Sequence, residues 1–359
     1  MLAVGANLYR AETSAWKSMW NTGGFHTCGI SLNRAYCWGN NAVGELGDGS
    51  TSNRAVPTPV AGGLQVIGIS AGGVHTCAWT GTNRGYCWGG NNAGQLGNGT
   101  FMDRRQPTPV ATTLRLRSMD AGALHTCADS LGGQLHCWGS NEYGQLGDGT
   151  FADRRNPVRV GMTKKFSPAV GGSSISLGAF HGCGLNLGAH LAGGRAWCVG
   201  RNDGGQLGDG TAVQRPTLVA VQDGHRFLAI SAGANHTCGI LSGSRTLLCW
   251  GNNSSGQLGD GTAQTRLTPT PVTSVVRFAV VAAGTEHTCA VSVDGEAYCW
   301  GQNTEGQLGD GTRNNRALPC VWWLPDPACS GTSVPSITTG FDEHAVRRVR
   351  SVMVVGDPE

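Results

Sequence analysis

One pattern returns six times along the chain. A His-x-Cys is followed after about ten residues by a second Cys, and Trp-Gly follows this Cys in five of the six copies. Each copy then continues with Asn-x-x-Gly-Gln/Glu-Leu-Gly-Asp/Asn-Gly. The copies begin at His26, His75, His125, His181, His236 and His287, so the spacing runs from 49 to 56 residues. A period near fifty residues is typical of propellers and solenoids. Short β-rich runs between glycine clusters favour strands over helices. Each copy is therefore predicted to be one β-blade of an all-β propeller.

The repeats divide the chain into three parts. Residues 23–320 hold the six repeats, residues 1–22 would supply N-terminal strands that close the ring, and residues 321–359 would form a C-terminal loop and closing segment. Segments 2–9 and 346–355 are candidate strands for a seventh blade assembled from both ends, although neither carries the repeated motif. We expect seven blades, with six blades or a piece of a longer array as the alternatives.

Cysteine spacing supports the blade prediction independently. A turn at residues 293–295 would set Cys289 opposite Cys299, and directly opposed residues in a non-hydrogen-bonded pair lie about 4.5 Å apart at Cα, within the usual disulfide range. The 14 cysteines thus form seven expected pairs: Cys28–Cys37, Cys77–Cys87, Cys127–Cys137, Cys183–Cys198, Cys238–Cys249, Cys289–Cys299 and Cys320–Cys329. Seven bridges with no cysteine left over indicate secretion, a periplasm or a cell surface.

Metal binding is the main alternative for the repeated His and Cys. Zinc normally needs a fourth ligand and often Cys-x-x-Cys spacing, and neither recurs here. A calcium site at the loop aspartates is disfavoured because each loop offers few carboxylates. We expect each histidine to fill a hydrogen-bonded polar position inside its blade, with no metal and no cofactor.

The loop after the second cysteine has fixed demands of its own. Its leucine, first seen as Leu46, is expected to plug the core between blades, and its asparagine, first seen as Asn41, to bridge loop backbone groups. An arginine follows the loop Asp or Asn by six residues each time. These pairs are expected to brace the loops or join blades: Asp48–Arg54, Asn98–Arg104, Asp148–Arg154, Asp209–Arg215, Asp260–Arg266 and Asp310–Arg316.

Residues that vary between repeats are the candidates for binding, because loops on a rigid scaffold often carry function. Tyr143, Phe101 and Phe151 fall in these variable positions, which should crown one face of the disc. Trp322 and Trp323 lie in a loop that Cys320 and Cys329 would staple, where they could anchor a partner or seal the last blade. Trp197 stands before its cysteine in the fourth repeat. We interpret this shift as repeat drift rather than as the mark of a binding loop.

His-Thr-Cys, Tyr-Cys-Trp-Gly and Asn-x-x-Gly-Gln-Leu-Gly-Asp-Gly-Thr resemble the repeat of the regulator of chromosome condensation family over about residues 23–320. The resemblance implies a β-propeller, usually of seven blades, and extends to a secreted β-lactamase-inhibitor protein of the same fold. It implies fold more firmly than function. Family members that act as nucleotide exchange factors on a small GTPase are nuclear and use an inserted wedge. The even spacing and the cysteines argue against that role here.

Composition narrows the functional classes further. A net charge of +3 is too mild to predict nucleic-acid binding, and no run approaches 18 apolar residues. No secretory leader is visible, so an exported protein would have lost its leader or the chain is incomplete. Sequons at Asn98, Asn252 and Asn253 would accept glycans only in a eukaryotic secretory route.

No catalytic constellation stands out from the repeat background. We predict a non-enzymatic extracellular scaffold that binds another protein, itself or the other subunits of a surface assembly. A secreted enzyme inhibitor and a carbohydrate-binding propeller are the alternatives.

Overall fold

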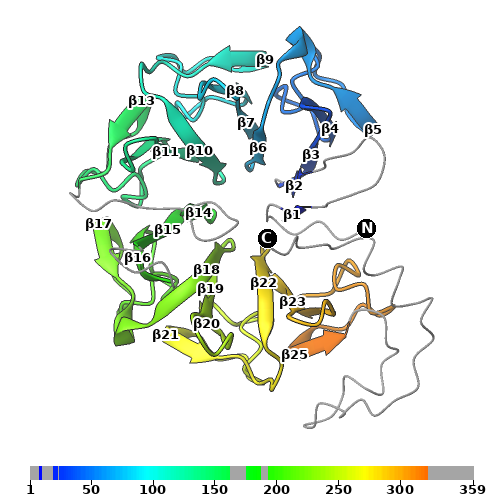
Figure 1. Ribbon diagram of the computed structural model, residues 1–359, viewed down its shortest axis with the longest axis vertical. Helices are drawn as coiled ribbons and strands as arrows, with labels where there is room; N and C mark the ends of the chain where they lie inside the picture. The colour runs from blue at the N-terminus through cyan, green and yellow to red at the C-terminus, as the bar shows by residue number, and fades with distance from the viewer. Residues whose placement is uncertain (1–7, 10–18, 23, 162–174, 187–192, 322–359) are drawn as a thin grey trace.

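The computed structural model describes residues 8–9, 19–22, 24–161, 175–186 and 193–321. Within these ranges the chain forms six antiparallel blades, which lie around a ring with the first strand of each blade near its centre (Figure 1). The first strands of successive blades contact one another from β2 through β6, β10, β14 and β18 to β22. No helix in the described part is long and apolar enough to cross a membrane. The all-β propeller prediction is confirmed.

The first three blades cover the N-terminal half of the chain, and a short 3₁₀ helix, η1 (Ala61–Gly63), joins the first to the second. Their strands are β1 (Leu8–Tyr9), β2 (Met19–Thr22), β3 (His26–Ser31), β4 (Arg34–Gly39) and β5 (Arg54–Pro59); β6 (Gly68–Ala71), β7 (His75–Trp79), β8 (Gly85–Gly89) and β9 (Arg104–Pro109); and β10 (Leu116–Ala121), β11 (His125–Ser130), β12 (Leu135–Gly139) and β13 (Arg154–Arg159).

The last three blades follow the same order, and η2 (Gln222–Gly224) joins the fourth to the fifth. Their strands are β14 (Ile175–Leu177), β15 (His181–Asn186), β16 (Gly194–Gly200) and β17 (Arg215–Ala220); β18 (Arg226–Ala232), β19 (His236–Leu241), β20 (Leu247–Gly251) and β21 (Arg266–Pro271); and β22 (Phe278–Ala283), β23 (His287–Ser292), β24 (Ala297–Gly301) and β25 (Arg316–Val321). Strand β16 also pairs with β18, so the fourth and fifth blades share one sheet.

The N-terminal segment supplies strands to the first blade. Strand β2 pairs with β3, so the first blade begins before residue 23 and takes its innermost strand from the segment that was expected to close the ring. Strand β1 adds a further strand to this same blade. The expected C-terminal strand at 346–355 lies outside the described residues, and the six-or-seven-blade alternative stands.

Each described blade carries a disulfide across its central hairpin. The two cysteines face each other directly in the strand register, as with Cys289 and Cys299, and their Cα atoms are 4.1 Å apart. The tight turn expected at residues 293–295 is present, because the Ser292 amide donates to the Glu296 carbonyl. Six of the seven expected disulfides are thus confirmed. Cys320 is disulfide-bonded too, and its expected partner Cys329 lies outside the described residues.

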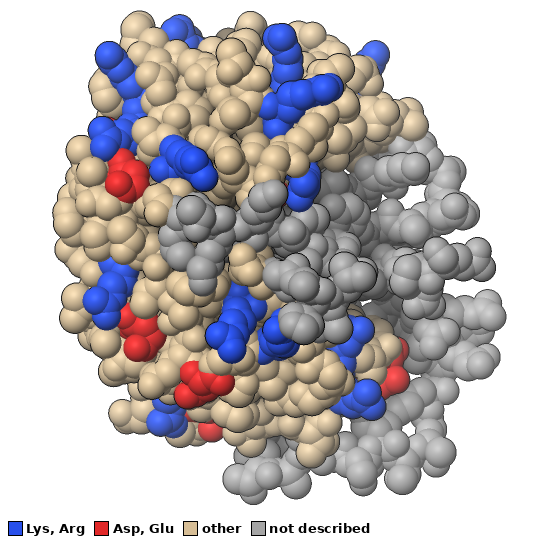
Figure 2. Space-filling model, turned by 60° about the vertical axis from the view of Figure 1, so that its left-hand side comes forward, with Lys and Arg blue, Asp and Glu red and all other residues tan. Residues whose placement is uncertain are grey.

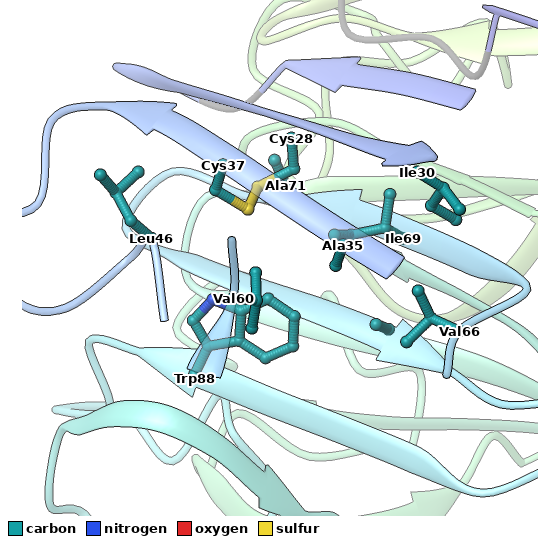
Figure 3. Close-up of a cluster of buried hydrophobic side chains, with 11 residues drawn as sticks. Cys28, Ile30, Ala35, Cys37, Leu46, Val60, Val66, Ile69, Ala71 and Trp88 are labelled. Atoms are coloured by element: carbon teal, nitrogen blue, oxygen red, sulfur yellow. A yellow bond between two sulfur atoms is a disulfide. The ribbon is translucent and has the colours of Figure 1, made fainter. Parts of the chain in front are cut away.

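The hydrophobic core lies mainly between blades. Figure 3 shows one cluster in which Leu46 and the Cys28–Cys37 disulfide of the first blade pack with Ile69 and Trp88 of the second. Leu46 and Trp88 are both fully buried. Gly47 makes this approach possible, since its φ is +68° and a Cβ there would lie 2.6 Å from Trp88 Nε1. Leu46 therefore occupies the interblade position that its pattern predicts.

Candidate functional site: the blade seams and the rim

The repeated histidines join neighbouring blades. His26 Nε2 lies 2.8 Å from the Thr76 hydroxyl of the next blade, and that hydroxyl donates to the Glu45 carbonyl at 2.8 Å. Because the hydroxyl donates to the carbonyl, it accepts from the imidazole, so His26 carries its proton on Nε2. Trp88 Nε1 donates to the same carbonyl at 2.9 Å. We call the contact between two consecutive blades a seam, and these three bonds are its recurring hydrogen bonds.

Four of the five described seams contain all three bonds. In each of these seams the histidine and the tryptophan bond a group of the neighbouring blade, not of their own. The histidine pairs are His75 with Thr126, His181 with Thr237 and His236 with Thr288. The expectation that each histidine is satisfied inside its own blade is therefore wrong. Strand pairing within one repeat does not show which side chains of the next repeat lie against it. The threonine that bonds each histidine could therefore not be identified from a single repeat.

The seam between the third and fourth blades lacks these bonds. Gly182 replaces the threonine and Val199 replaces the tryptophan, and neither ring nitrogen of the buried His125 has a hydrogen-bond partner among the described residues. A small cavity, large enough for about one water molecule, is lined here by Gln145, Gly182 and Val199. The shifted Trp197 packs against the core of this seam instead. The fourth repeat's departure thus removes the recurring hydrogen bonds from one particular seam.

Burial keeps the repeated histidines neutral. It lowers the pKa of His26, His125 and His287 to about 4, and that of His75, His181 and His236 to about 3, where neighbouring histidines add a smaller effect. The cysteines beside them are oxidised to disulfides, so they offer no thiolate to a metal. No group of three His, Cys, Asp or Glu side chains in the described ranges is arranged to hold a metal ion.

One half-buried carboxylate, that of Asp120, lies among the innermost strands. Asp120 accepts hydrogen bonds from the Ser70 hydroxyl of the second blade and the Leu177 amide of the fourth, both at 2.8 Å. Burial raises the pKa of Asp120 to about 6, against the opposing effect of these hydrogen bonds. The recurring motif did not point to this aspartate, because its strand position is not a fixed one and carries asparagine, serine or alanine in the other blades. Asp120 ties three blades together around the ring's centre.

The loop after each hairpin is held rigid by its own side chains. Asn41 Oδ1 accepts from the Leu46 amide at 2.9 Å, and Asn41 Nδ2 donates to the Ser52 carbonyl at 3.0 Å. Burial pushes the pKa of Asp48 upward, but hydrogen bonds from Ser50 and Arg54 outweigh it and hold the pKa below its ordinary value. Five Asp–Arg ion pairs recur in this place: Asp48–Arg54, Asp148–Arg154, Asp209–Arg215, Asp260–Arg266 and Asp310–Arg316. Each lies within one repeat and braces its loop.

The sixth expected pair does not form. Asn98 Oδ1 accepts from Thr100 and Asn91, which leaves the Asn98 amide nitrogen and Arg104 Nε both buried with no hydrogen-bond partner in the described structure. An amide has only one oxygen, and here the loop itself uses it. The expectation that Asn98 accepts from Arg104 is therefore wrong.

The sequons differ in accessibility. The buried Asn98 amide nitrogen and the fully buried Asn253, whose amide nitrogen donates to Asp260 and Thr262, have no room for a glycan in this fold. Glycosylation at Asn98 and Asn253 is thus incompatible with this structure. Asn252 is half-buried and stays a candidate.

The expected binding aromatics lie on the outer loops. Phe101 and Phe151 are each 50% exposed. Tyr143 is half-buried against Phe180 of the next blade, with its ring centroid 5.2 Å from the Arg201 guanidinium. Trp322 and Trp323 lie outside the described residues. Val43, from the variable loop positions, and Phe101, from the segment after Gly-Thr, line one open hollow. The two kinds of variable segment therefore meet on the same side of the ring, which we call the rim.

The sequence reasoning missed the arginines of this rim. Arg155 lies over the Phe101 ring, 5.8 Å from its centroid. The signal was present as Phe-x-Asp-Arg-Arg, which occurs only in the second and third repeats. Figure 2 shows Lys and Arg side chains at several places on the side of the ring where β13 and β17 lie, with Asp and Glu among them. A surface of half-exposed rings and arginines suits contact with another protein.

The regulator of chromosome condensation (RCC1) repeat profile matches residues 33–79, 84–128, 132–185, 193–240, 246–291 and 294–340. Ultraviolet-B receptor UVR8 of Arabidopsis thaliana is 34% identical over 126 residues, which cover 34% of this chain and 28% of that protein. Protein pim1 of Schizosaccharomyces pombe is 27% identical over 146 residues, covering 35% of this chain and 26% of that protein. The matches thus span about a quarter of these relatives' length.

Solved structures agree in fold over most of the chain. Human WBSCR16 matches with a TM-score of 0.73 at 19% identity and covers 88% of this chain and 84% of that one. Yeast RCC1 (Prp20), in its complex with Kap60, matches with a TM-score of 0.72 at 23% identity, covering 87% and 76%. These neighbours share the fold, and the six matched repeats place the chain in the RCC1 repeat family.

Proposed function

We propose that this protein is a non-enzymatic propeller scaffold of the extracellular space or cell surface, which binds another protein through the loops of its rim. The half-exposed Phe101 and Phe151 carry the proposal, because their loops are fixed by side-chain hydrogen bonds and the Phe151 loop also by an ion pair. Apolar rings held in place lose little entropy when a partner covers them. Two related structures support protein binding as a family role: yeast RCC1 (Prp20) is bound to Kap60, and Prp20p has binding properties to Gsp1p and histones.

The compartment part of the proposal rests on the disulfides. Six within described hairpins, together with the bonded Cys320, are typical of an oxidising environment. Intact mass after alkylation under denaturing, non-reducing conditions, with protein from its native source, tests this directly. Fourteen protected cysteines are expected, and mostly free thiols would overturn the extracellular assignment.

Binding is tested with the full chain immobilised against the extracellular and cell-surface fraction of its source. A partner of the rim should bind a Phe101→Ala/Phe151→Ala variant about thirtyfold more weakly or worse, because central aromatic anchors often contribute about 2 kcal/mol or more. Val275→Ser is the matched control, since Val275 is exposed but lies in the connection before β22. Equal binding by wild type and the double variant would contradict the rim as the binding surface.

The nature of the captured protein separates the alternatives. Capture of structural proteins or of the chain itself supports the scaffold. A captured enzyme whose activity falls at equimolar protein would replace it with a secreted inhibitor. A glycan-array signal that disappears when a rim aromatic is removed would replace it with a carbohydrate-binding propeller.

A further inference from the structure

Two arginines occupy the same position at consecutive blade seams. The Gly49 amide donates to the Arg105 carbonyl at 2.9 Å, and the Gly99 amide donates to the Arg155 carbonyl at 2.9 Å. A Cβ built on Gly44 would touch Arg105 just as one built on Gly94 would touch Arg155. The backbone of each arginine is therefore held in the same way against the loop of the preceding blade.

The two side chains differ in what covers them. Arg155 is covered by Phe101, which lies two residues after Gly99 in the preceding blade's loop. Thr51 holds the same place relative to Gly49, so Arg105 faces a threonine where Arg155 faces a ring. Within the described part of the chain, the Arg105 guanidinium has no hydrogen bond, ion pair or ring contact.

The missing ring leaves an open space at this seam. A hollow of about 400 Å³ is lined by Val43, Thr51, Phe101, Met102, Asp103 and Arg105, and we call it the rim hollow. Its apolar walls are accessible, since Phe101 is 50% and Met102 is 65% exposed. Arg105 places a cation on one wall, and Asp103 places a carboxylate on another. Asp103 Oδ1 accepts a hydrogen bond from the Asn91 amide at 2.8 Å.

We propose that the rim hollow accepts a tryptophan side chain from a protein partner, with the indole ring on Arg105 as the Phe101 ring lies under Arg155. The face of an aromatic ring is negative and attracts a guanidinium, and tryptophan binds cations best of the aromatic residues. Asp103 offers a hydrogen-bond acceptor that suits the indole N–H, which phenylalanine lacks. This inference rests on the proposed protein-binding function and names the chemistry of the partner.

The test uses the full disulfide-bonded chain with ¹³C-methyl methionine and N-acetyl-tryptophanamide as the probe. The Met102 methyl signal should shift saturably at millimolar probe, whereas the signal of the fully buried Met119 should not move. Arg105→Ala should weaken binding about threefold or more, as expected for an exposed cation–π contact. Absence of a saturable Met102 shift would overturn the proposal.

A filled hollow provides the sharper control. Thr51→Phe places a ring from the chain itself beneath Arg105 and should abolish the saturable shift while the Met119 signal keeps its native position. Ala212→Phe adds a ring at the equivalent loop position facing Leu267, where no arginine stands, and should leave probe binding unchanged. Undiminished probe binding by Thr51→Phe would show that the probe binds elsewhere.

Partner binding separates this inference from the proposed function. A rim-binding partner should lose affinity for Thr51→Phe and keep it for Ala212→Phe. Equal affinity for both variants would overturn the rim hollow as the partner's site and leave the scaffold proposal standing. Probe binding without any captured partner would contradict the scaffold. Sedimentation velocity on the protein alone identifies a second copy as the occupant, if a dimer forms and Thr51→Phe abolishes it, which would exclude a separate partner.

Discussion

Gly182→Thr should stabilise the protein by repairing the seam between the third and fourth blades. In the neighbouring seam the Thr126 hydroxyl lies 2.8 Å from His75 Nε2 and donates to the Gln95 carbonyl at 2.8 Å. Gly182 holds the equivalent strand position beside His125, whose two ring nitrogens lack partners in the described structure. A threonine here would supply the missing hydroxyl.

The expected magnitude follows from three contributions. A buried polar group without a partner costs about 1–3 kcal/mol, which the new hydroxyl would recover in part. Replacing a strand glycine removes about 0.5–1 kcal/mol of backbone entropy cost. Against these, a Cβ at Gly182 would lie 2.7 Å from Leu177 Cδ2, and moving that flexible side chain off its rotamer costs about 0.5–1.5 kcal/mol. The net stabilisation is about 1–2 kcal/mol.

Equilibrium unfolding in guanidinium chloride under non-reducing conditions measures the effect. Gly182→Thr should raise the midpoint with an unchanged denaturant slope. Thr126→Val is the matched opposite, because it keeps the side-chain shape and removes the hydroxyl from an intact seam, at a cost of about 1–3 kcal/mol. If Thr126→Val destabilises the protein while Gly182→Thr is neutral or destabilising, the missing hydroxyl is not what weakens the third seam.

Three further outcomes test other parts of the structure. Asn98→Asp should give Arg104 Nε its acceptor and stabilise the protein by about 1 kcal/mol. Asp148→Asn should create the same defect in the next blade and destabilise the protein. A shift of the two variants' denaturant midpoints in the same direction would contradict this. The free energy of unfolding should rise from about pH 4 to pH 6.5, because the buried histidines have folded pKa values of about 3 to 4 and the unfolded chain binds more protons in that window. Asp120, with its pKa raised to about 6, binds its proton more tightly when folded and opposes that rise, so Asp120→Asn should steepen the pH profile; a flatter profile would refute the assignment. Leu96→Ala, at a fully buried interblade position, should cost about 2–5 kcal/mol by thermal or denaturant unfolding, and a loss below about 1 kcal/mol would show that the seam collapses to fill the space.

Features contained in one repeat were predictable from the sequence. The turn after Ser292 and the alternation of a strand determine that Cys289 faces Cys299, because hairpin register follows from the turn. The burial of Leu46 and the Asp48–Arg54 ion pair likewise follow from spacing within one loop.

Features that join two repeats were not predictable in this way. The His26–Thr76 bond and the Arg155–Phe101 contact depend on how one blade is placed against the next, which no local pattern encodes. Asn98 was misjudged for a different reason: the number of donors competing for its one oxygen is known only once the loop is built.

Every disulfide between described residues closes a single hairpin, with cysteines 9 to 15 positions apart. Denaturant can therefore separate the blades without erasing the pairing of their central strands, so the oxidised unfolded chain is a string of pre-registered hairpins rather than a random coil. Refolding from that state needs few new local contacts and consists largely of docking one blade on the next. The oxidised protein should consequently refold much faster than the reduced one, with the seams limiting the rate.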